Sequence, residues 1–485
     1  MLFMGIDVGT QGVRTVIVNE KGNVLASEAS AFKDINIAQQ PGYYEQNAED
    51  WWLAAAQTVK TCTVQLSSHG FSVGDISTIS IDGTSGTIVP LDTEYKPLCN
   101  ALMYNDMRAS AEALQVHEAF SGLEKSQGFR FNASFSLPRI LWIRNNLPEI
   151  YSRTKVFAHQ ADYIAGRLCG EYCVSDYSNA LKTGYDLVKN KWPDELEKLG
   201  LENGKFPVIV PPGSPIARIS RKAAEQLGLS GKTQVVGGST DGYASALAAG
   251  AVRVGDWASI IGTTLVLKGI TEKLVIDPAG SGYSHKLPSG AWMFGGASNI
   301  GGRCLNNRFE KAEFALYDKT VDELSPTGVL CYPLTGKGER FPFVDPEAVE
   351  FIIGNAEDRK VLYTALMEGV GFAERLAFER MESLGCNVGS GIFTTGGACR
   401  SEEWLRIRAS ILNRQLKVPA VVDAAMGSAM LAASSHFGSL EAAASALIKI
   451  EKVVDPVYEK VQRFNELYGR FYEECRNRYR LGGAC

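Results

Sequence analysis

The stretch GIDVGTQGVRTVIV, residues 5–18, decides the fold that we expect for this chain. An apolar strand runs into Asp7, two glycines and a threonine, and then resumes as a second strand. Gly9 and Gly12 permit positive φ and a close approach of the backbone, and successive N–H groups in such a turn can bind phosphate oxygens. The stretch therefore predicts a phosphate-binding hairpin with the Asp7 carboxylate at the end of its first strand. The alternative is a local turn that Asp7 closes with its own side chain.

The composition is that of an ordinary globular protein. The chain has 485 residues, of which 45% are hydrophobic and 21% charged, and this length suggests about two to four domains. The net charge of −5 and the pI of about 5.8 exclude a basic surface for nucleic acid as the dominant feature. No apolar run is long enough to span a membrane and no signal peptide is visible, so we expect a cytoplasmic protein without a membrane partner.

The ten cysteines lie far apart, and CGEYC (residues 169–173) has neither the spacing nor the second half of a zinc site. We expect reduced, mostly buried thiols and no cysteine metal centre.

Strand and helix patterns alternate along the chain, which predicts an α/β fold. Residues 3–30 form a predicted antiparallel meander, and Asn47 is a predicted N-cap before an apolar helix. A second glycine–threonine hairpin, in residues 256–269, resembles the first and suggests two related halves. The apolar stripe of residues 457–475 predicts a helix packed within the chain or in a homodimer.

Asp241 lies in GGSTDGYASA, where a loop enters a helix of small residues. Near the positive end of that helix its carboxylate stays ionised, which suits a base that accepts a hydroxyl proton. Helix capping is the alternative for an aspartate at this place.

Two more glycine-rich turns follow predicted strands. The first, DGTSGT at residues 82–87, brings hydroxyl groups to the end of a strand. The second, TTGGACRSEEW at residues 394–404, lets a flat ligand approach the backbone, with Trp404 on the following helix. Each of them alone is also compatible with a tight turn.

Taken in order, these motifs resemble the FGGY family of carbohydrate kinases, within the sugar kinase, Hsp70 and actin superfamily. The likeness runs from Gly5 to about residue 438 and rests on GIDVGTQGVR, IDGTSGT, SDYSNALKTGYD, GGSTDG, IIGTTLVLKG, GASNIGG, GERFP and TTGGACRSEEW. The resemblance implies two ribonuclease-H-like domains, placed here at residues 1–246 and 247–485, with ATP and a sugar in an interdomain cleft.

The resemblance also implies roles for individual residues. Asp241 is the expected catalytic base and Asp7 the expected Mg²⁺ site; the sugar is expected at Ser85 and Asp241, with Thr84 and Asp7 beside them. The expected nucleotide-binding residues are Thr10, Gln11, Gly12, Arg14, Gly262, Thr263, Thr264, Gly397, Ala398, Ser401 and Trp404. The chain departs from the family at Gln11, where many members have serine, and at Ala398, which replaces a glycine.

The motifs define the identity of the sugar substrate less closely than they define the reaction. Typical xylulose kinases carry Met-His-Gly where this chain has Thr84-Ser85-Gly86, and DGTSGT, SDYSNALKTGY and SGYSHKL look more like the D-ribulose kinase branch. The resemblance thus implies phosphorylation of D-ribulose, with D-xylulose as the alternative. A nucleotide-dependent switch or a sugar sensor without turnover is a more distant alternative.

Overall fold

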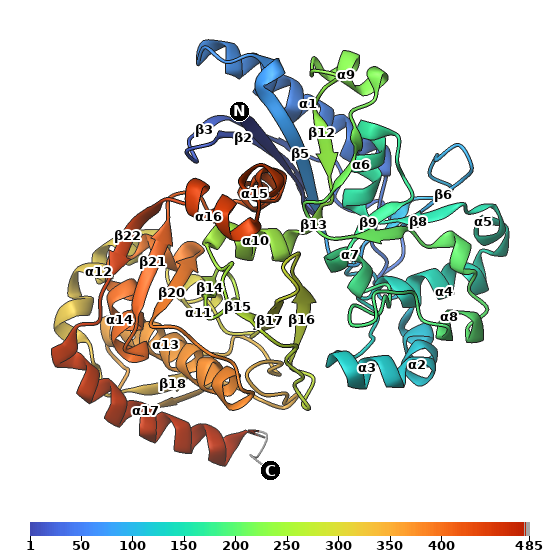
Figure 1. Cartoon of the computed structure of the whole chain (residues 1–485). Helices are drawn as coiled ribbons and strands as arrows, with labels where there is room; N and C mark the ends of the chain where they lie inside the picture. The colour runs from blue at the N-terminus through green and yellow to red at the C-terminus, as the bar shows by residue number, and fades with distance from the viewer. Residues whose placement is uncertain (480, 482–485) are drawn as a thin grey trace. The chain divides into compact units, whose positions relative to one another are not determined.

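The computed structural model describes residues 1–479 and 481, so Cys485 lies outside the described residues. The chain forms two compact units (Figure 1). Unit 1 comprises residues 1–248, 285–291 and 423–448; unit 2 comprises residues 249–284, 292–422 and 449–485. These units follow contacts in space, whereas the expected domains at 1–246 and 247–485 follow sequence order and stay a prediction.

Unit 1 is built mainly from the first half of the chain. Its elements are β1 (Leu2–Val8), β2 (Gly12–Asn19), β3 (Val24–Ala31), β4 (Glu45–Gln46), α1 (Ala48–Ser68), η1 (Val73–Asp75), β5 (Ile76–Gly83), β6 (Val89–Leu91), β7 (Ala101–Leu102), α2 (Ser110–Ala119), α3 (Ser121–Gln127), α4 (Ser136–Asn146), α5 (Pro148–Arg153), β8 (Val156–Ala158), α6 (Gln160–Cys169), β9 (Val174–Asp176), α7 (Tyr177–Leu181), α8 (Glu195–Lys198), η2 (Asn203–Lys205), β10 (Val208–Val210), β11 (Pro215–Arg218), α9 (Arg221–Leu227), β12 (Gln234–Val236), β13 (Ser239–Thr240), α10 (Asp241–Ala249), α15 (Ala424–Phe437) and α16 (Leu440–Leu447).

The main sheet of unit 1 has the strand order β11-β12-β5-β1-β2-β3, with β13 paired to β5. The predicted meander is confirmed, since β1, β2 and β3 pair antiparallel. Strand β5 adds parallel to β1 and β12 adds parallel to β5. Asn47 caps α1 as predicted, because its side chain accepts a hydrogen bond from the Glu49 amide.

Helix α15 packs against β1 and β5 although it lies more than 300 residues further along the chain (Figure 1). The approach is close at two glycines: a Cβ on Gly5 would lie 1.9 Å from the Ala425 carbonyl oxygen, and one on Gly427 would lie 2.0 Å from the Ala244 oxygen. Only glycine permits such backbone contact. Helix α15, from near the C-terminal end of the chain, thus covers the sheet that carries Asp7.

Unit 2 repeats the plan of unit 1. Its elements are β14 (Trp257–Ile261), β15 (Leu265–Thr271), β16 (Gly282–Lys286), β17 (Trp292–Ala297), α11 (Arg303–Asn306), α12 (Lys311–Leu324), β18 (Leu330–Tyr332), β19 (Phe351–Ile353), α13 (Arg359–Ser383), β20 (Gly391–Thr395), η3 (Gly397–Arg400), α14 (Glu402–Leu412), β21 (Gln415–Pro419), β22 (Ile450–Val454) and α17 (Tyr458–Arg478).

Its sheet has the order β16-β17-β15-β14-β20-β21-β22. The antiparallel run β17-β15-β14 followed by parallel β20 and β21 matches β3-β2-β1 followed by β5 and β12. The predicted α/β class with two related halves is therefore confirmed.

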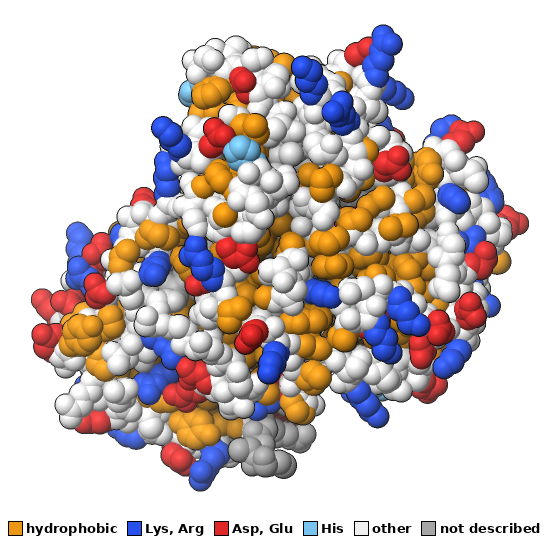
Figure 2. Space-filling model, viewed as in Figure 1, with side chains coloured by type: hydrophobic (Ala, Val, Ile, Leu, Met, Phe, Trp, Pro, Cys, Tyr) orange, Lys and Arg blue, Asp and Glu red, His pale blue; other side chains and the backbone are white. Residues whose placement is uncertain are grey.

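Each unit has its own core. The apolar stripe of α17 packs in the core of unit 2, with Phe464, Leu467 and Phe471 fully buried. Within the described part of the chain the cysteines are free, and no helix combines the length and the hydropathy needed to cross a membrane. On the face drawn in Figure 2, basic and acidic side chains are interspersed.

We expect Gly5→Ala to destabilise the protein, because the new methyl group would meet the backbone of α15, which cannot turn away. Overpacking of this kind costs about 1–3 kcal/mol of unfolding free energy. The matched control is Gly122→Ala in α3, where a Cβ would meet nothing within 4 Å. Urea unfolding of both variants checks the expectation, and equal stabilities would contradict it.

Candidate active site

The turn between β1 and β2 is the predicted first phosphate hairpin. The Gly9 amide donates to the Gly12 carbonyl oxygen at 3.0 Å. The carbonyl of Thr10 accepts from Gln46 Nε2 at 2.8 Å, and that of Gln11 accepts from the Phe32 amide at 2.9 Å. The turn is thus tied to the segments on either side of it.

The two glycines of this turn do not use the positive φ that they permit. Gly12 is needed for a different reason, since its Cβ would lie 2.3 Å from the Ser30 carbonyl oxygen on β3. Close strand packing, rather than turn conformation, fixes glycine at this position.

Two aspartates stand side by side at the carboxyl ends of β1 and β5. Asp7 and Asp82 are partners in the parallel register, and each carboxyl group influences the pKa of the other. Asp82 is fully buried and its Oδ2 accepts from Ser428 Oγ of α15 at 2.5 Å. Two carboxyl groups therefore lie together at this edge of the sheet.

Burial raises the pKa of Asp7 to about 6. The neighbouring Asp82 side chain and the charge of Arg14 oppose this shift, while the charges of Asp241 and Asp423 add to it. Burial, followed by the charge of Asp7, raises the pKa of Asp82 well above its usual range. Four carboxyl groups of unit 1 therefore influence one small region, where a cation would relieve their repulsion.

Arg14, a predicted phosphate ligand, forms an ion pair with Asp423, the N-cap of α15. Asp82, Asp423 and Ser428 were not among the predicted site residues. Asp82 could have been found from the sequence, because two parallel strands that both end in aspartate bring their carboxyl groups to the same edge of the sheet. Asp423 and Ser428 are too distant in sequence for such an argument.

Asp241 is the first residue of α10 and directly follows β13. The Gly242 amide donates to its Oδ1 at 2.6 Å. Strand β13 pairs with the end of β5, with Ser239 opposite Asp82. Since β1 and β13 both pair with this end of β5, Asp241 and Asp7 lie at the same edge of the sheet, and the charge of Asp241 contributes to the raised pKa of Asp7.

Thr84 and Ser85 follow β5 and differ in their hydrogen bonding. The Thr84 hydroxyl bonds to Thr87 Oγ1 at 2.6 Å and donates to Gln160 Oε1 at 2.7 Å. The Ser85 hydroxyl is buried and, among the described residues, has no hydrogen-bond partner. A buried hydroxyl without a hydrogen bond costs free energy unless a ligand supplies the partner. Ser85 is therefore better placed than Thr84 to bond to a sugar hydroxyl.

In unit 2, the turn between β14 and β15 forms the predicted second hairpin. The amides of Gly302 and Arg303 donate to the carbonyls of Gly262 and Thr263, at 2.8 and 3.3 Å. A Cβ on Gly301 would lie 2.6 Å from the Thr263 oxygen. The segment after β17 therefore supports this hairpin by backbone contact.

Glu339 in turn holds that supporting segment. It is 3% exposed, and its carboxylate accepts from Ser298 Oγ and the Asn299 amide, both at 2.7 Å. Tyr332 Oη and the Arg340 amide also donate to it, each at 2.9 Å. Glu339 belongs to the GERFP motif, but no role had been predicted for it.

The expected adenosine side lies between β20 and α14. Gly396 has φ 96°, and a Cβ there would lie 2.4 Å from the Ile261 oxygen, so this turn abuts the second hairpin. Gly397 is open, and Ala398 is buried. Ser401 caps α14. The Trp404 ring is 4% exposed and its Nε1 donates to the Met367 carbonyl, so contact of Trp404 with a nucleotide stays a prediction.

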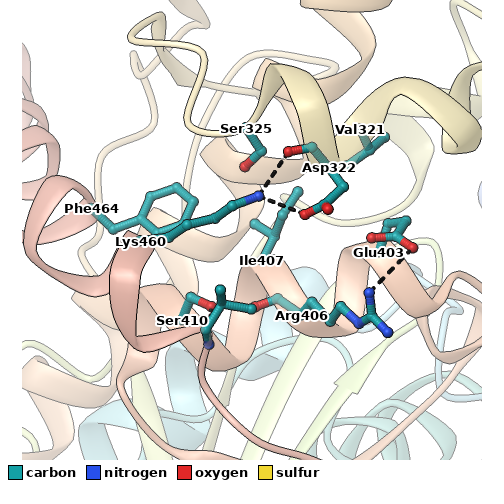
Figure 3. A pocket seen from close by; sticks show the side chains of 10 residues that line it. Val321, Asp322, Ser325, Glu403, Arg406, Ile407, Ser410, Lys460 and Phe464 are labelled. Carbon is teal, nitrogen blue, oxygen red and sulfur yellow. Dashed lines mark hydrogen bonds and ion pairs between the residues drawn. The ribbon is translucent and has the colours of Figure 1, made fainter.

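A pocket elsewhere in unit 2 lies among α12, α14 and α17 (Figure 3). Lys460 Nζ bonds to Asp322 there, at 2.6 Å to Oδ1 and 2.8 Å to the carbonyl oxygen. The pocket has a volume of about 10 Å³, room for roughly one water molecule. It contains no predicted site residue and is too small for a sugar.

The residues around Asp7 fit a magnesium ion. Mg²⁺ prefers hard oxygen ligands and is usually held by one or two carboxylates together with substrate phosphates. Asp7 supplies such a carboxylate, and Asp82 Oδ1 is a buried oxygen that accepts no hydrogen bond from the described residues. The electrostatic strain on Asp7 is what a bound cation would remove.

Comparison with known proteins gives one consistent result. Residues 2–248 match the N-terminal domain of the FGGY family of carbohydrate kinases, and residues 256–436 match its C-terminal domain. A xylulose kinase of Bacillus subtilis is 29% identical over 485 residues, covering 96% of this chain and 95% of that enzyme. A gluconokinase of the same species is 28% identical over 442 residues, covering 86% and 84%.

Solved structures share the fold. The xylulose kinase of Rhodospirillum rubrum superposes with a TM-score of 0.87 at 23% identity, covering 98% of this chain and 99% of that one. The glycerol kinase of Plasmodium falciparum, solved with ADP, gives 0.84 at 19% identity, covering 98% of both chains.

We expect Asp7→Asn to stabilise the protein in the absence of nucleotide and divalent cations. The folded-state pKa of Asp7, about 6, lies above its ordinary value of 3.8. Between these values the folded state binds more protons than the unfolded state, so wild-type stability falls as the pH rises. The variant should therefore gain about 1–3 kcal/mol at pH 8 and little below pH 4.

Urea unfolding in EDTA at several pH values measures this difference. The matched control is Asp34→Asn at an exposed position, which should show no such growth with pH. An equal gain for Asp7→Asn at pH 4 and pH 8 would contradict the assignment of strain to this carboxyl group.

Proposed function

The chain belongs to the FGGY family of carbohydrate kinases, and from this membership we propose that it phosphorylates a ketopentose at its terminal hydroxyl. D-ribulose, giving D-ribulose 5-phosphate, is the first candidate substrate. The observation that carries the proposal is the clustering of Asp241 with Asp7 at the ends of β13 and β1. One carboxylate can take a hydroxyl proton while the other lies beside a phosphate-binding turn.

In the proposed reaction Asp241 accepts the proton of the sugar hydroxyl while that oxygen attacks the γ-phosphorus of ATP. The new P–O bond forms as the bond to the β-phosphate oxygen breaks, and ADP leaves. Catalysis of this type depends on positioning and on neutralising the charge of the phosphates. Mg²⁺, when bound beside Asp7, would supply part of that neutralisation, and Arg14 and the two hairpins would orient the phosphoryl oxygens.

The choice of sugar rests on the loop after β5. Thr84-Ser85-Gly86 replaces the Met-His-Gly of typical xylulose kinases, which favours D-ribulose. The relatives named xylulose kinase keep D-xylulose as the second candidate. The two sugars differ only at C3, and a buried hydroxyl partner such as Ser85 can discriminate strongly between them.

Coupled ADP release with MgATP tests the proposal against D-ribulose, D-xylulose, L-ribulose, ribitol, gluconate and glycerol, beside a control without sugar. We expect the highest kcat/KM for D-ribulose. A preference for D-xylulose would support the proposed reaction but contradict D-ribulose as the substrate. A rate that none of these compounds raises above the control would contradict the proposed ketopentose kinase and favour the switch or sensor alternatives.

Asp241→Ala should lower kcat by about 10²–10⁴-fold, the usual contribution of a general base. ATP affinity, measured by equilibrium titration with a nucleotide analogue, should stay within about twofold, because the base is not needed to bind the phosphates. A loss of kcat of only a few-fold would overturn the role of Asp241.

Glu339→Ala should raise KM for ATP by about tenfold and leave KM for the sugar within about twofold, because the second hairpin loses its support. Glu339→Gln keeps acceptors for the Asn299 and Arg340 amides and should retain most of the affinity. Glu368→Ala is the matched control, since Glu368 is equally buried but holds Ser325 and Thr327 instead. Similar effects of both alanine variants on KM for ATP would contradict the proposed support.

A further inference from the structure

Within SDYSN, residues 175–179, three buried polar side chains hold the strand that directly precedes Asp241: those of Asp176, Ser178 and Asn179. We propose that Asp176, acting through Ser178 and Asn179, is a positioning residue for the catalytic aspartate. This inference rests on the proposed function of Asp241 as the base. It adds residues whose hydrogen bonds lead to the strand before Asp241.

Asp176 organises the first turn of α7 as its N-cap. Its Oδ1 accepts from the Ser178 amide and Ser178 Oγ, both at 2.8 Å, and from the Asn179 amide at 3.1 Å. Its Oδ2 accepts from Asn179 Nδ2 at 2.7 Å. One carboxylate therefore fixes the rotamers of both side chains that follow it.

Ser178 and Asn179 in turn hydrogen-bond to the backbone of β13. The Thr240 amide donates to Ser178 Oγ at 2.8 Å, and Asn179 Nδ2 donates to the Ser239 carbonyl at 3.2 Å. On its other side β13 pairs with β5, Ser239 opposite Asp82 and Thr240 opposite Gly83. Ser239 and Thr240 are thus bonded to β5 on one side and to α7 on the other, and Asp241 follows them directly in the chain.

Burying three polar side chains costs free energy, which indicates that they do more than fill space in the core. Asp176, Ser178 and Asn179 are each no more than 1% exposed, and burial raises the pKa of Asp176 to about 6. A carboxylate in such a place is unfavourable unless its bonds compensate. Apolar side chains could fill the same volume, but they could not orient the peptide groups of Ser239 and Thr240. Because a base displaced by about 1 Å can lose 10²-fold in rate, the orientation matters for turnover.

The test substitutes Ser178→Ala, with Ser175→Ala as the matched control. Ser175 is also buried, and its hydroxyl bonds to His159 Nδ1 at 3.2 Å rather than to β13. We expect Ser178→Ala to lower kcat about tenfold or more with the preferred sugar and to leave KM for ATP within about twofold. Ser175→Ala should keep kcat within about twofold. Asn179→Ala, as a second variant, should repeat the effect if Ser178→Ala folds poorly, and thermal melting checks both.

A double-mutant cycle with Asp241→Asn separates positioning from general damage. Residues that act as one unit are not additive, so Ser178→Ala should change the residual sugar-dependent rate of Asp241→Asn by less than about twofold. An equal fold-loss in both backgrounds, or a wild-type kcat in Ser178→Ala, would overturn the inference. If the wild-type enzyme phosphorylates no sugar, the proposed function fails instead, which the wild-type assay reports before any variant is measured.

Discussion

The constraint on which unit 1 depends is the pairing of two carboxyl groups, Asp7 and Asp82, at the ends of adjacent parallel strands. Buried carboxylates repel each other and lose hydration, so the fold must compensate for them. It does so with Ser428 Oγ on Asp82 and with Arg14 beside Asp423. The site is therefore strained in the free protein and suited to a cation and phosphate oxygens.

Helix α15 is the element that makes this pairing feasible. It supplies Ser428, and its N-cap is Asp423. It lies close against the sheet because Gly5 has no side chain, and close against α10 because Gly427 has none. The same helix contacts the backbone of α10 at Ala244, so the strand that carries Asp7 and the helix that begins with Asp241 share one packing partner. Stability and catalytic geometry are thus coupled through backbone contacts rather than through exposed loops.

A common device recurs in both units: a buried carboxylate orients a short segment, and that segment orients the functional residues. In unit 1 Asp176 organises Ser178 and Asn179, which hold the peptide groups before Asp241. In unit 2 Glu339 holds Ser298 and Asn299, which precede the support of the second hairpin. In both units the buried carboxylate thus fixes the backbone of a segment next to the predicted site residues.

The sequence by itself determined the α/β class, the two hairpins, the helix begun by Asn47 and the motif order that identifies the family, because these are encoded in short contiguous patterns. It also placed Asp7 and Asp241 at the ends of elements. Only the tertiary structure decided that Asp423 and Ser428 join Asp7 and Asp82, that the Thr84 hydroxyl is hydrogen-bonded to Gln160, and that Trp404 lies in a core. These facts depend on contacts between segments that are distant in the sequence, and no local periodicity carries information about them.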